Sequence, residues 1–448
     1  MDLVIKNAKL LYRGGLVEAC VGVDGGRVVR IAKEASMPRA DESYDAEGCL
    51  LLPGMVDAHV HLRDPGYTHE EDFASGTAAA ACGGVTTVAD MPNNDPPVLD
   101  LSSWRLKLEA ARKAHVDYAL YAAASATRLG ELAKLIEEGA AGVKAYMAHP
   151  SPELRATPRL IARALRALQA SGTPLLVHAE DRGLLERRLK GVCVEDPLTY
   201  AKVRGPLVEA VAVRKALRAL SSTGGRLHLC HLSSAWSVKL VEEAKASGLQ
   251  VTAETCPHYL LLTRRDLKRA GVLCKVDPPV KAGRHRLALW RAVWRRVVDL
   301  VASDHAPHRL EDRVAGGFLD APSGFAGVEL TLSLLLDCVN KGLLSLVDVV
   351  ELYSRNPAKL LGLHPPKGGL EKGFDADLTI ASMSEELKVK TDKLHSKAPE
   401  TPFEGRVIKG VLKATFVRGL LVAESGEVKA RPGWGRLLRP RRGVEAWA

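Results

Sequence analysis

Short runs of apolar residues recur along the middle of the chain, and stretches with a helical pattern separate them. The eight runs are MVDAHVH, GVTTVADM, YALYAAAS, GVKAYM, PLLVHAE, LHLCHLS, VTAETCPH and VDLVASDH. The intervening stretches, such as SSWRLKLEAARKAH and PRLIARALRALQASG, are rich in Ala, Leu, Arg and Glu. Strands that alternate with helices in this way are typical of a parallel (β/α)8 barrel, which we predict over residues 52–365.

The two ends of the chain share a different pattern. Residues 1–51 contain the short β-rich stretches LVIKNAKLL, EACVGVDGG, RVVRIAKEA and EGCLLL, with turns that contain Gly between them. Residues 366–448 repeat this style in LEKGFDADLTIAS and GRVIKGVLKATFVRGLLVAES. We therefore predict one small β-sandwich domain that is assembled from both chain ends.

The positions of titratable residues favour the barrel over a doubly wound open sheet. No GxGxxG motif follows any of the eight runs, whereas an open sheet that binds a dinucleotide would carry one. Titratable side chains instead stand at or near the carboxyl ends of the runs, where barrel enzymes place their active sites. These residues are His59, His61, Lys144, His178, His231 and Asp304.

The composition is that of an ordinary globular protein. Of the 448 residues, 46% are apolar and 26% are charged. No apolar run is long enough to span a membrane, and the N-terminus lacks the long apolar stretch of a secretory signal. We expect a soluble, cytoplasmic protein with no membrane partner. The eight cysteines are scattered without a CxxC motif, which predicts reduced thiols.

The chain carries a net charge of +10. Most of this charge is spread along the sequence, and the one dense basic cluster runs from Lys429 to Arg442, where Pro and Gly interrupt any helix. Charge alone is weak evidence for binding to nucleic acid, and a basic enzyme with an anionic small-molecule substrate is the more common case. We therefore expect no nucleic-acid partner, and the cluster has no assigned role.

The residues at the ends of the runs include good metal ligands. His59 and His61 form an HxH pair whose side chains point to the same face of a strand, as two zinc ligands do. Alone, this pair is equally compatible with packing, and a lone His178 or His231 is more often a hydrogen-bonded buried histidine. Asp304 follows apolar residues and needs a partner charge or a metal there. Together, the five residues predict a metal-assisted hydrolase with one or two ions.

Lys144 stands in the middle of GVKAYM and is the exception in this set. An ammonium group that pointed at cations would be repelled by them. The ordinary interpretation is a lysine that reaches solvent or forms an ion pair. The alternative is a reaction of its amine with carbon dioxide to give an anionic carbamate that bridges two metals. The spacing of the residues does not decide between these interpretations.

Six motifs then occur in one order along the chain: GMVDAHVHLRDPGYTHEEDF, GGVTTVADMPNNDPP, AGVKAYM, VHAED, HLCHLS and ASDHAPH. With these motifs the chain resembles the dihydroorotases of the cyclic amidohydrolase superfamily over nearly its whole length. HVHLRDPG and MPNNDPP are the most specific of them, and DADLTI and PGWGR near the C-terminus are also similar to that superfamily. The resemblance implies a (β/α)8 barrel beside a β-sandwich domain from both chain ends, with hydrolysis at two zinc ions.

The resemblance also implies a role for individual residues. It assigns His59, His61 and Asp304 to the first zinc ion, His178 and His231 to the second, and carboxylated Lys144 to the bridge between them. Four further positions match residues that contact the substrate in the family: Arg63, Asn93, His308 and Gly324. A planar guanidinium suits a carboxylate that is bound through two hydrogen bonds, so Arg63 fits an acidic substrate.

The implied reaction is the reversible cyclisation of N-carbamoyl-L-aspartate to L-dihydroorotate in de novo pyrimidine biosynthesis. The nucleophile of the hydrolytic direction is a zinc-activated hydroxide, and Asp304 is the general acid and base. Allantoinases and hydantoinase-like enzymes share the metal ligands, so only pocket residues separate them, and Arg63 favours dihydroorotate. A catalytically silent scaffold paralogue is a further alternative, against which the complete ligand set argues. A homo-oligomer is compatible with such a barrel, although no residue pattern fixes it.

Two features stay open in the sequence. Asp277 stands in VDPP, where relatives carry Asn or Arg, and it would repel an anionic substrate unless it turns away or pairs with Lys275 or Lys281. The segment 309–323 follows Asp304 and contains two adjacent glycines. A mobile loop over the site and a static loop are equally compatible with this segment.

Overall fold

The structure is a computed structural model that describes residues 1–12 and 14–441. Its larger part is an eight-stranded parallel sheet with the order β13-β12-β11-β10-β9-β8-β7-β6. A parallel bridge between Val60 and His305 brings the first strand next to the last, so the sheet is nearly closed into a barrel. The strands are β6 Met55–Val60, β7 Val85–Asp90, β8 Asp117–Ala123, β9 Gly142–Tyr146, β10 Leu175–His178, β11 Leu227–Leu229, β12 Val251–Thr255 and β13 Leu300–Val301. The predicted barrel is confirmed.

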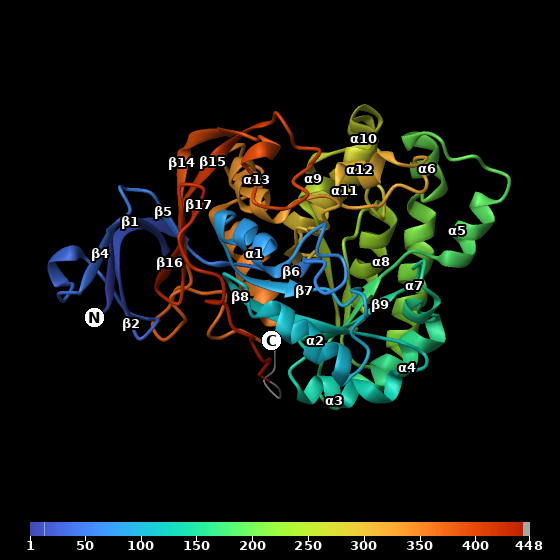
Figure 1. Cartoon of the computed structure of the whole chain (residues 1–448), viewed down its shortest axis with the longest axis horizontal. Coiled ribbons are helices and arrows are strands. Elements are labelled where there is room, and N and C mark those ends of the chain that lie inside the picture. Colours follow the sequence, from blue (N-terminus) through green and yellow to red (C-terminus); the bar gives the residue numbers. More distant parts are fainter. Residues whose placement is uncertain (13, 442–448) are drawn as a thin grey trace.

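Helices surround the barrel (Figure 1). They are α1 Phe73–Cys82, α2 Leu101–Ala111, α3 Leu132–Glu137, α4 Pro158–Leu168, α5 Arg182–Leu189, α6 Pro197–Val203, α7 Pro206–Thr223, α8 Ala235–Ala246, α9 Pro257–Leu261, α10 Arg264–Ala270, α11 Gly283–Trp294, α12 Leu310–Val314, α13 Val328–Asn340, α14 Leu346–Val350 and α15 Asn356–Leu360. Short 3-10 turns are η1 Glu34–Ser36, η2 Leu129–Glu131, η3 Pro152–Leu154, η4 Gly271–Cys274 and η6 Thr391–Lys393, and η5 Glu351–Arg355 is a π-helical turn.

Helix α4 shows why the polar and apolar pattern forms these helices. Thr157 accepts a hydrogen bond from Leu160 N as the N-cap, and Pro158 occupies the first helical position, where its missing N–H costs nothing. One face of the helix is apolar and buried against the barrel, as the helical period requires. The residues of this face are Leu160, Ile161, Ala164, Leu165 and Leu168. Within the described residues, no helix combines the length and apolar character needed to cross a membrane.

The second part is a nine-stranded mixed sheet that both chain ends build (Figure 1, blue and red). Its order is β17-β16-β15-β14-β5-β1-β2-β3, and β4 pairs with β1. Strand β5 joins the two ends, because it pairs in parallel with β1 and antiparallel with β14. Side chains from both halves, such as Ile5, Val21, Leu378 and Phe416, share one buried core. The predicted β domain from both chain ends is therefore confirmed.

The strands of this sheet are β1 Leu3–Tyr12, β2 Gly15–Asp24, β3 Arg27–Ala32, β4 Glu42–Asp45, β5 Leu50–Pro53, β14 Leu378–Lys388, β15 Val407–Val417, β16 Leu420–Glu424 and β17 Glu427–Val428. The chain leaves the sheet after Pro53 and enters the barrel at Met55, with Gly54 alone between β5 and β6. This short connection fixes the barrel close to the sheet.

The C-terminal segment packs against the start of β8. Gly435 N donates to Ala114 O at 2.9 Å, and Leu438 N donates to Tyr118 O at 2.8 Å. Arg436 adds an ion pair to Asp375 at 3.2 Å. The described part of the basic cluster, up to Arg441, thus closes one end of the barrel, a role that the sequence pattern did not reveal; Arg442 lies outside the described residues.

A buried lysine holds the two parts together at this end. The Nζ atom of Lys367 lies 2.7 Å from Asp117, 3.1 Å from Asp375 and 2.6 Å from Asp377, and its side chain is 1% exposed. Burial alone would lower the pKa of Lys367, but the three carboxylates raise it. The lysine therefore neutralises carboxylates that come from β8 and from the chain before β14.

We expect a Lys367→Met variant to be destabilised by about 3–5 kcal/mol, because three buried carboxylates lose their shared cation. The measurement is the thermal denaturation temperature, compared with that of Lys372→Met, which removes an exposed lysine nearby. Equal denaturation temperatures for the two variants would show that the buried cluster does not hold the fold together.

Candidate active site

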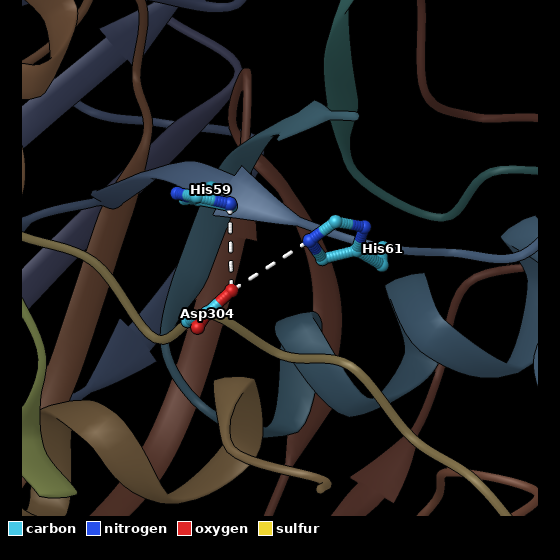
Figure 2. A group of neighbouring side chains, drawn as sticks. All are labelled: His59, His61 and Asp304. Carbon is cyan, nitrogen blue, oxygen red and sulfur yellow. Dashed lines mark ion pairs between the residues drawn. The ribbon is translucent and has the colours of Figure 1, made fainter. Parts of the chain in front are cut away.

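The predicted metal ligands meet at one mouth of the barrel. Three of them, His59, His61 and Asp304, point toward one another from the end of β6 and the segment after β13 (Figure 2). Asp304 Oδ1 lies 3.4 Å from His59 Nε2 and 3.6 Å from His61 Nε2. Their ligand atoms form a group that could hold a metal ion.

The other three predicted ligands lie beside this group. His178, at the end of β10, and His231, just after β11, face each other with 3.1 Å between Nδ1 of the former and Nε2 of the latter. Lys144 on β9 places its Nζ atom 3.4 Å from His59 Nε2. The rings of His59 and His231 are 5.3 Å apart between centroids. All six predicted ligands therefore belong to one cluster.

The outer ring nitrogens of three histidines have their own polar neighbours. His59 Nδ1 lies 2.5 Å from Glu254 Oε1, His61 Nδ1 lies 2.8 Å from Asn93 Oδ1, and His178 Nε2 lies 3.3 Å from Glu180 Oε2. Glu254 also accepts His231 N and contacts His228 Nε2 at 3.0 Å. Such outer partners fix the orientation and the tautomer of metal-binding histidines, and leave the inner nitrogens for the metal.

The inner atoms fit a zinc-type metal. Two nitrogen ligands at about 2.0–2.1 Å from one tetrahedral zinc ion stand about 3.3 Å apart. The separations of 3.1 Å between His178 and His231 and 3.4 Å between His59 and Asp304 match this spacing. His231 Nδ1 is buried without a hydrogen-bond partner. Buried imidazoles whose nitrogens lie this close together are compatible with a metal centre.

Burial keeps the candidate ligands in the form that binds metal. Burial, followed by the charge of Lys144, lowers the pKa of His59 to about 4. Burial and the neighbouring His178 also hold the pKa of His231 well below its usual value. A histidine must be neutral to coordinate a metal, and with lowered pKa values these rings are neutral at physiological pH. Although burial alone would raise it, the pKa of Glu254 is lowered by His59 and His228, so it stays an anion.

Three residues of the cluster region have a strained backbone. Arg63, His231 and Asp304 have positive φ angles of 60°, 39° and 51°. Residues other than glycine adopt this region at a cost, and such strain concentrates where a side chain must be aimed at a functional site. All three are among the residues that the sequence predicted to act in the site.

The predicted substrate residues lie around this cluster. Arg63 Nη2 is 2.7 Å from His308 Nε2, and Glu70 supports both, at 3.4 Å from Arg63 Nε and 2.7 Å from His308 Nδ1. Asn93 contacts His61, as described above. Gly324 has a φ of 133°, and a Cβ atom there would lie 2.3 Å from Ala306 O, so only glycine fits.

The structure resolves the environment of Asp277 differently from both pairings considered in the sequence. Asp277 does not pair with Lys275 or Lys281: its carboxylate contacts Arg204 Nη1 at 3.0 Å and accepts a hydrogen bond from Tyr200 OH. Arg204 also holds Glu180, at 2.5 Å. Arg204 therefore offsets part of the charge of Asp277, which weakens the expected repulsion of an anionic substrate. The pairing of Asp277 with a lysine was wrong, because the end of α6 places Arg204 beside Asp277.

The segment 309–323 is anchored to the barrel. It contains the short helix α12, and Lys275 Nζ donates to Leu319 O at 2.8 Å and to Ala321 O. Buried Arg313 donates to Val272 O. Lys275 is thus engaged by the loop, which is a further reason why it does not pair with Asp277.

Sequence reasoning missed Glu254 and Arg204. Glu254 lies inside VTAETC, one of the apolar runs, and it is buried. A carboxylate in a buried strand needs a partner charge or a metal, as was argued for Asp304. That signal was available in the sequence. Arg204 stands in a helical region rich in basic residues, where nothing local distinguishes it from solvent-exposed arginines.

Comparisons with known proteins identify relatives over nearly the whole chain. The model of the amidohydrolase family matches residues 50–422. A dihydroorotase from Methanosarcina mazei is 37% identical over 453 residues, which cover 98% of this chain and 97% of the relative. An allantoinase from Rubrobacter xylanophilus is 37% identical over 449 residues, which cover 98% of each chain.

Among solved structures, the L-hydantoinase (dihydropyrimidinase) from Arthrobacter aurescens superposes with a TM-score of 0.94 at 33% identity, covering 98% of this chain and 99% of that one. The relatives therefore carry three different names at similar identity, and the family match extends over most of the chain. The chain belongs to the amidohydrolase family and is a metal-dependent cyclic amide hydrolase.

Proposed function

We propose that the protein is a dihydroorotase, which interconverts N-carbamoyl-L-aspartate and L-dihydroorotate. The observation that carries this proposal is the Arg63–His308 pair beside the metal cluster. Dihydroorotate carries a carboxylate on its ring, whereas hydantoin and allantoin have none. A guanidinium fixed at the mouth by Glu70 supplies a matched partner for that carboxylate. The relatives do not choose between the activities, because a dihydroorotase and an allantoinase are equally similar.

Two zinc ions, bridged by carboxylated Lys144, form the metal centre of this proposal. His59, His61 and Asp304 would hold the first ion, and His178 and His231 would hold the second. When bound, the ions supply an activated water and polarise the ring carbonyl. The bridge is supported by the surroundings of Lys144 Nζ, which lies 3.4 Å from His59 Nε2 and 3.0 Å from Cys230 Sγ.

The buried position of Lys144 supports its carboxylation. The residue is 1% exposed, and within the part of the chain that the structure describes no carboxylate lies within ion-pair distance of its Nζ atom. An ammonium group without a counter-charge is costly in such a place. Carbamate formation would replace that cation with an anion beside His59, which could bind a metal.

Different residues of the chain then bind the substrate and transfer the proton. Arg63 and His308 bind the substrate carboxylate and orient the ring. Asp304, next to His59 and His61, accepts the proton from the attacking water and donates it to the ring nitrogen that leaves. In the cyclisation direction the same carboxyl group gives and takes the proton in reverse order. Arg204 holds Asp277 away from the anionic substrate.

The alternatives differ from this proposal in specific residues. An allantoinase or hydantoinase uses the same ligands but has no use for a carboxylate clamp at Arg63. A silent scaffold paralogue has no reason to keep six ligands in one cluster with their outer partners. Both observations favour an active dihydroorotase.

The deciding experiment is a substrate comparison with the zinc-loaded protein. We expect kcat/KM for dihydroorotate to exceed the values for allantoin and hydantoin by about tenfold to a hundredfold or more, the contribution of hydrogen bonds to a charged group. Loss of ultraviolet absorbance measures the ring opening of dihydroorotate. Formation of the ring-opened product measures the hydrolysis of allantoin and of hydantoin. Faster turnover of allantoin or hydantoin would reject the dihydroorotase assignment while leaving the amidohydrolase family intact.

An Arg63→Met variant separates binding from chemistry. We expect KM for dihydroorotate to rise about tenfold to a hundredfold with a small change in kcat, because the lost hydrogen bonds to a charged group contribute about 1.5–3 kcal/mol. Steady-state kinetics provide the measurement, and any slow turnover of neutral hydantoin serves as the control, since it should not respond. An unchanged KM would remove Arg63 from carboxylate binding.

A further inference from the structure

A second pocket, separate from the candidate active site, is lined by basic side chains. Its volume is about 390 Å³. None of its described lining residues is acidic, and none is a candidate metal ligand. The basic lining residues are Arg188, Lys202, Arg264, Lys281, Arg284 and His285.

Most of this positive charge is not neutralised by the protein. Lys281 is buried and paired with Glu209 at 3.3 Å. In contrast, Lys202, Arg264 and Arg284 form no ion pair with any carboxylate of residues 1–12 and 14–441. All three side chains are exposed, so water and salt weaken their mutual repulsion, and an anion that entered between them would offset what remains of it.

Two helices begin at the same pocket. The 18-residue helix α7 has Gly205 as its N-cap, and the 12-residue helix α11 has Ala282. Neither residue has a side chain that can accept a hydrogen bond from the first turn, and both line the pocket. Pro206 has no N–H at the start of α7, and Val208 N and His285 N already donate to Gly205 O and Ala282 O, so the contribution of the two helices is mainly the positive ends of their dipoles, which add to the basic side chains.

The size and the remaining lining define the ligand further. A pocket of about 390 Å³ is in the range that holds a small organic molecule, and it is larger than one phosphate group needs. Leu198 and Val280 supply apolar surface beside the cations. We infer that this pocket binds a small organic anion with two or more phosphate charges, of the size of a nucleoside diphosphate. A concave site of this size does not match the extended backbone of a nucleic acid.

The test is calorimetric titration of the zinc-loaded protein with inorganic pyrophosphate and with ADP at fixed ionic strength. We expect each to bind once per chain and to compete with the other. An Arg264→Gln/Arg284→Gln variant should weaken both by at least about tenfold, because charge-assisted hydrogen bonds are lost. The matched control is Arg265→Gln/Arg286→Gln, which removes the same charge from α10 and α11 at positions that are also exposed but do not line the pocket.

The control should keep binding within about twofold, since long-range charge is screened at fixed salt. The Arg63→Met variant should also bind pyrophosphate and ADP as the unmodified protein does, which would show that this pocket is separate from the candidate active site. An equal loss in the control variant, loss in Arg63→Met, or absence of binding by both probes would overturn the proposal. Tighter binding of a single-stranded oligonucleotide than of ADP would assign the basic surface to nucleic acid instead.

Discussion

An Asp304→Asn variant should retain its metal but lose about a hundredfold to ten-thousandfold in kcat for dihydroorotate, the usual contribution of a general acid and base. The amide keeps an oxygen at the position that faces His59 Nε2 at 3.4 Å, so a ligand remains. It cannot accept the proton of the attacking water or return it to the ring nitrogen. Steady-state kinetics and elemental analysis of bound zinc give the two measurements.

The matched control for this variant is Glu311→Gln, in the same segment after β13. Its carboxylate is exposed, contacts Arg309 at 3.8 Å and does not belong to the metal cluster, so activity should stay near that of the unmodified protein. Near-normal turnover by Asp304→Asn would exclude Asp304 as the proton carrier. Complete loss of zinc would instead show that Asp304 acts mainly as a ligand.

The sequence predicted the barrel because eight apolar runs repeat with helical stretches between them. It also predicted where the polar residues meet, because carboxyl ends of parallel strands share one face of a barrel. His59, Lys144 and Asp304 lie on or after different strands, yet they form one cluster for this reason. The period of the apolar pattern and the parallel direction of the strands were sufficient to predict the barrel and the place where the polar residues meet.

The partners of these residues could not be predicted in the same way. Asp277 is held by Arg204 and Tyr200, which come from helix α6 and the residue after it, far away in the chain. Such pairings depend on how helices are placed over the barrel, and no local pattern encodes that. The ion cluster of Lys367 is a similar case, because it joins β8 to the segment before β14.

Substrate choice is the part of the function that the metal ligands cannot decide. Relatives named for three activities match this chain at 33% to 37% identity, so the shared cluster fixes the type of reaction rather than the substrate. Discrimination comes from polar groups that are left unpaired when the wrong substrate binds. In the proposed function this group is Arg63, which Glu70 and His308 hold in place and which the substrate carboxylate would contact.

A Lys144→Ala variant should hold less zinc and lose at least about a hundredfold to a thousandfold in kcat, the effect of removing one strong electrostatic contact to the reacting group. Without the bridge, the four histidines and Asp304 must hold two cations that repel each other. Elemental analysis should then show fewer than two ions per chain. Cys230→Ala provides the control, because Cys230 contacts Lys144 Nζ at 3.0 Å but is not a proposed ligand.

Acetate or propionate should partly restore zinc and turnover to Lys144→Ala, since a small carboxylate in the vacated space would supply the anionic oxygens that the proposed carbamate would supply. The unmodified protein, grown with isotope-labelled bicarbonate, should show a labelled carbamate by nuclear magnetic resonance. If Lys144→Ala kept two ions and full activity, the lysine would be a buried structural residue. The proposed carbamate bridge would then be excluded, and the lack of a carboxylate within ion-pair distance of Lys144 among residues 1–12 and 14–441 would need another explanation.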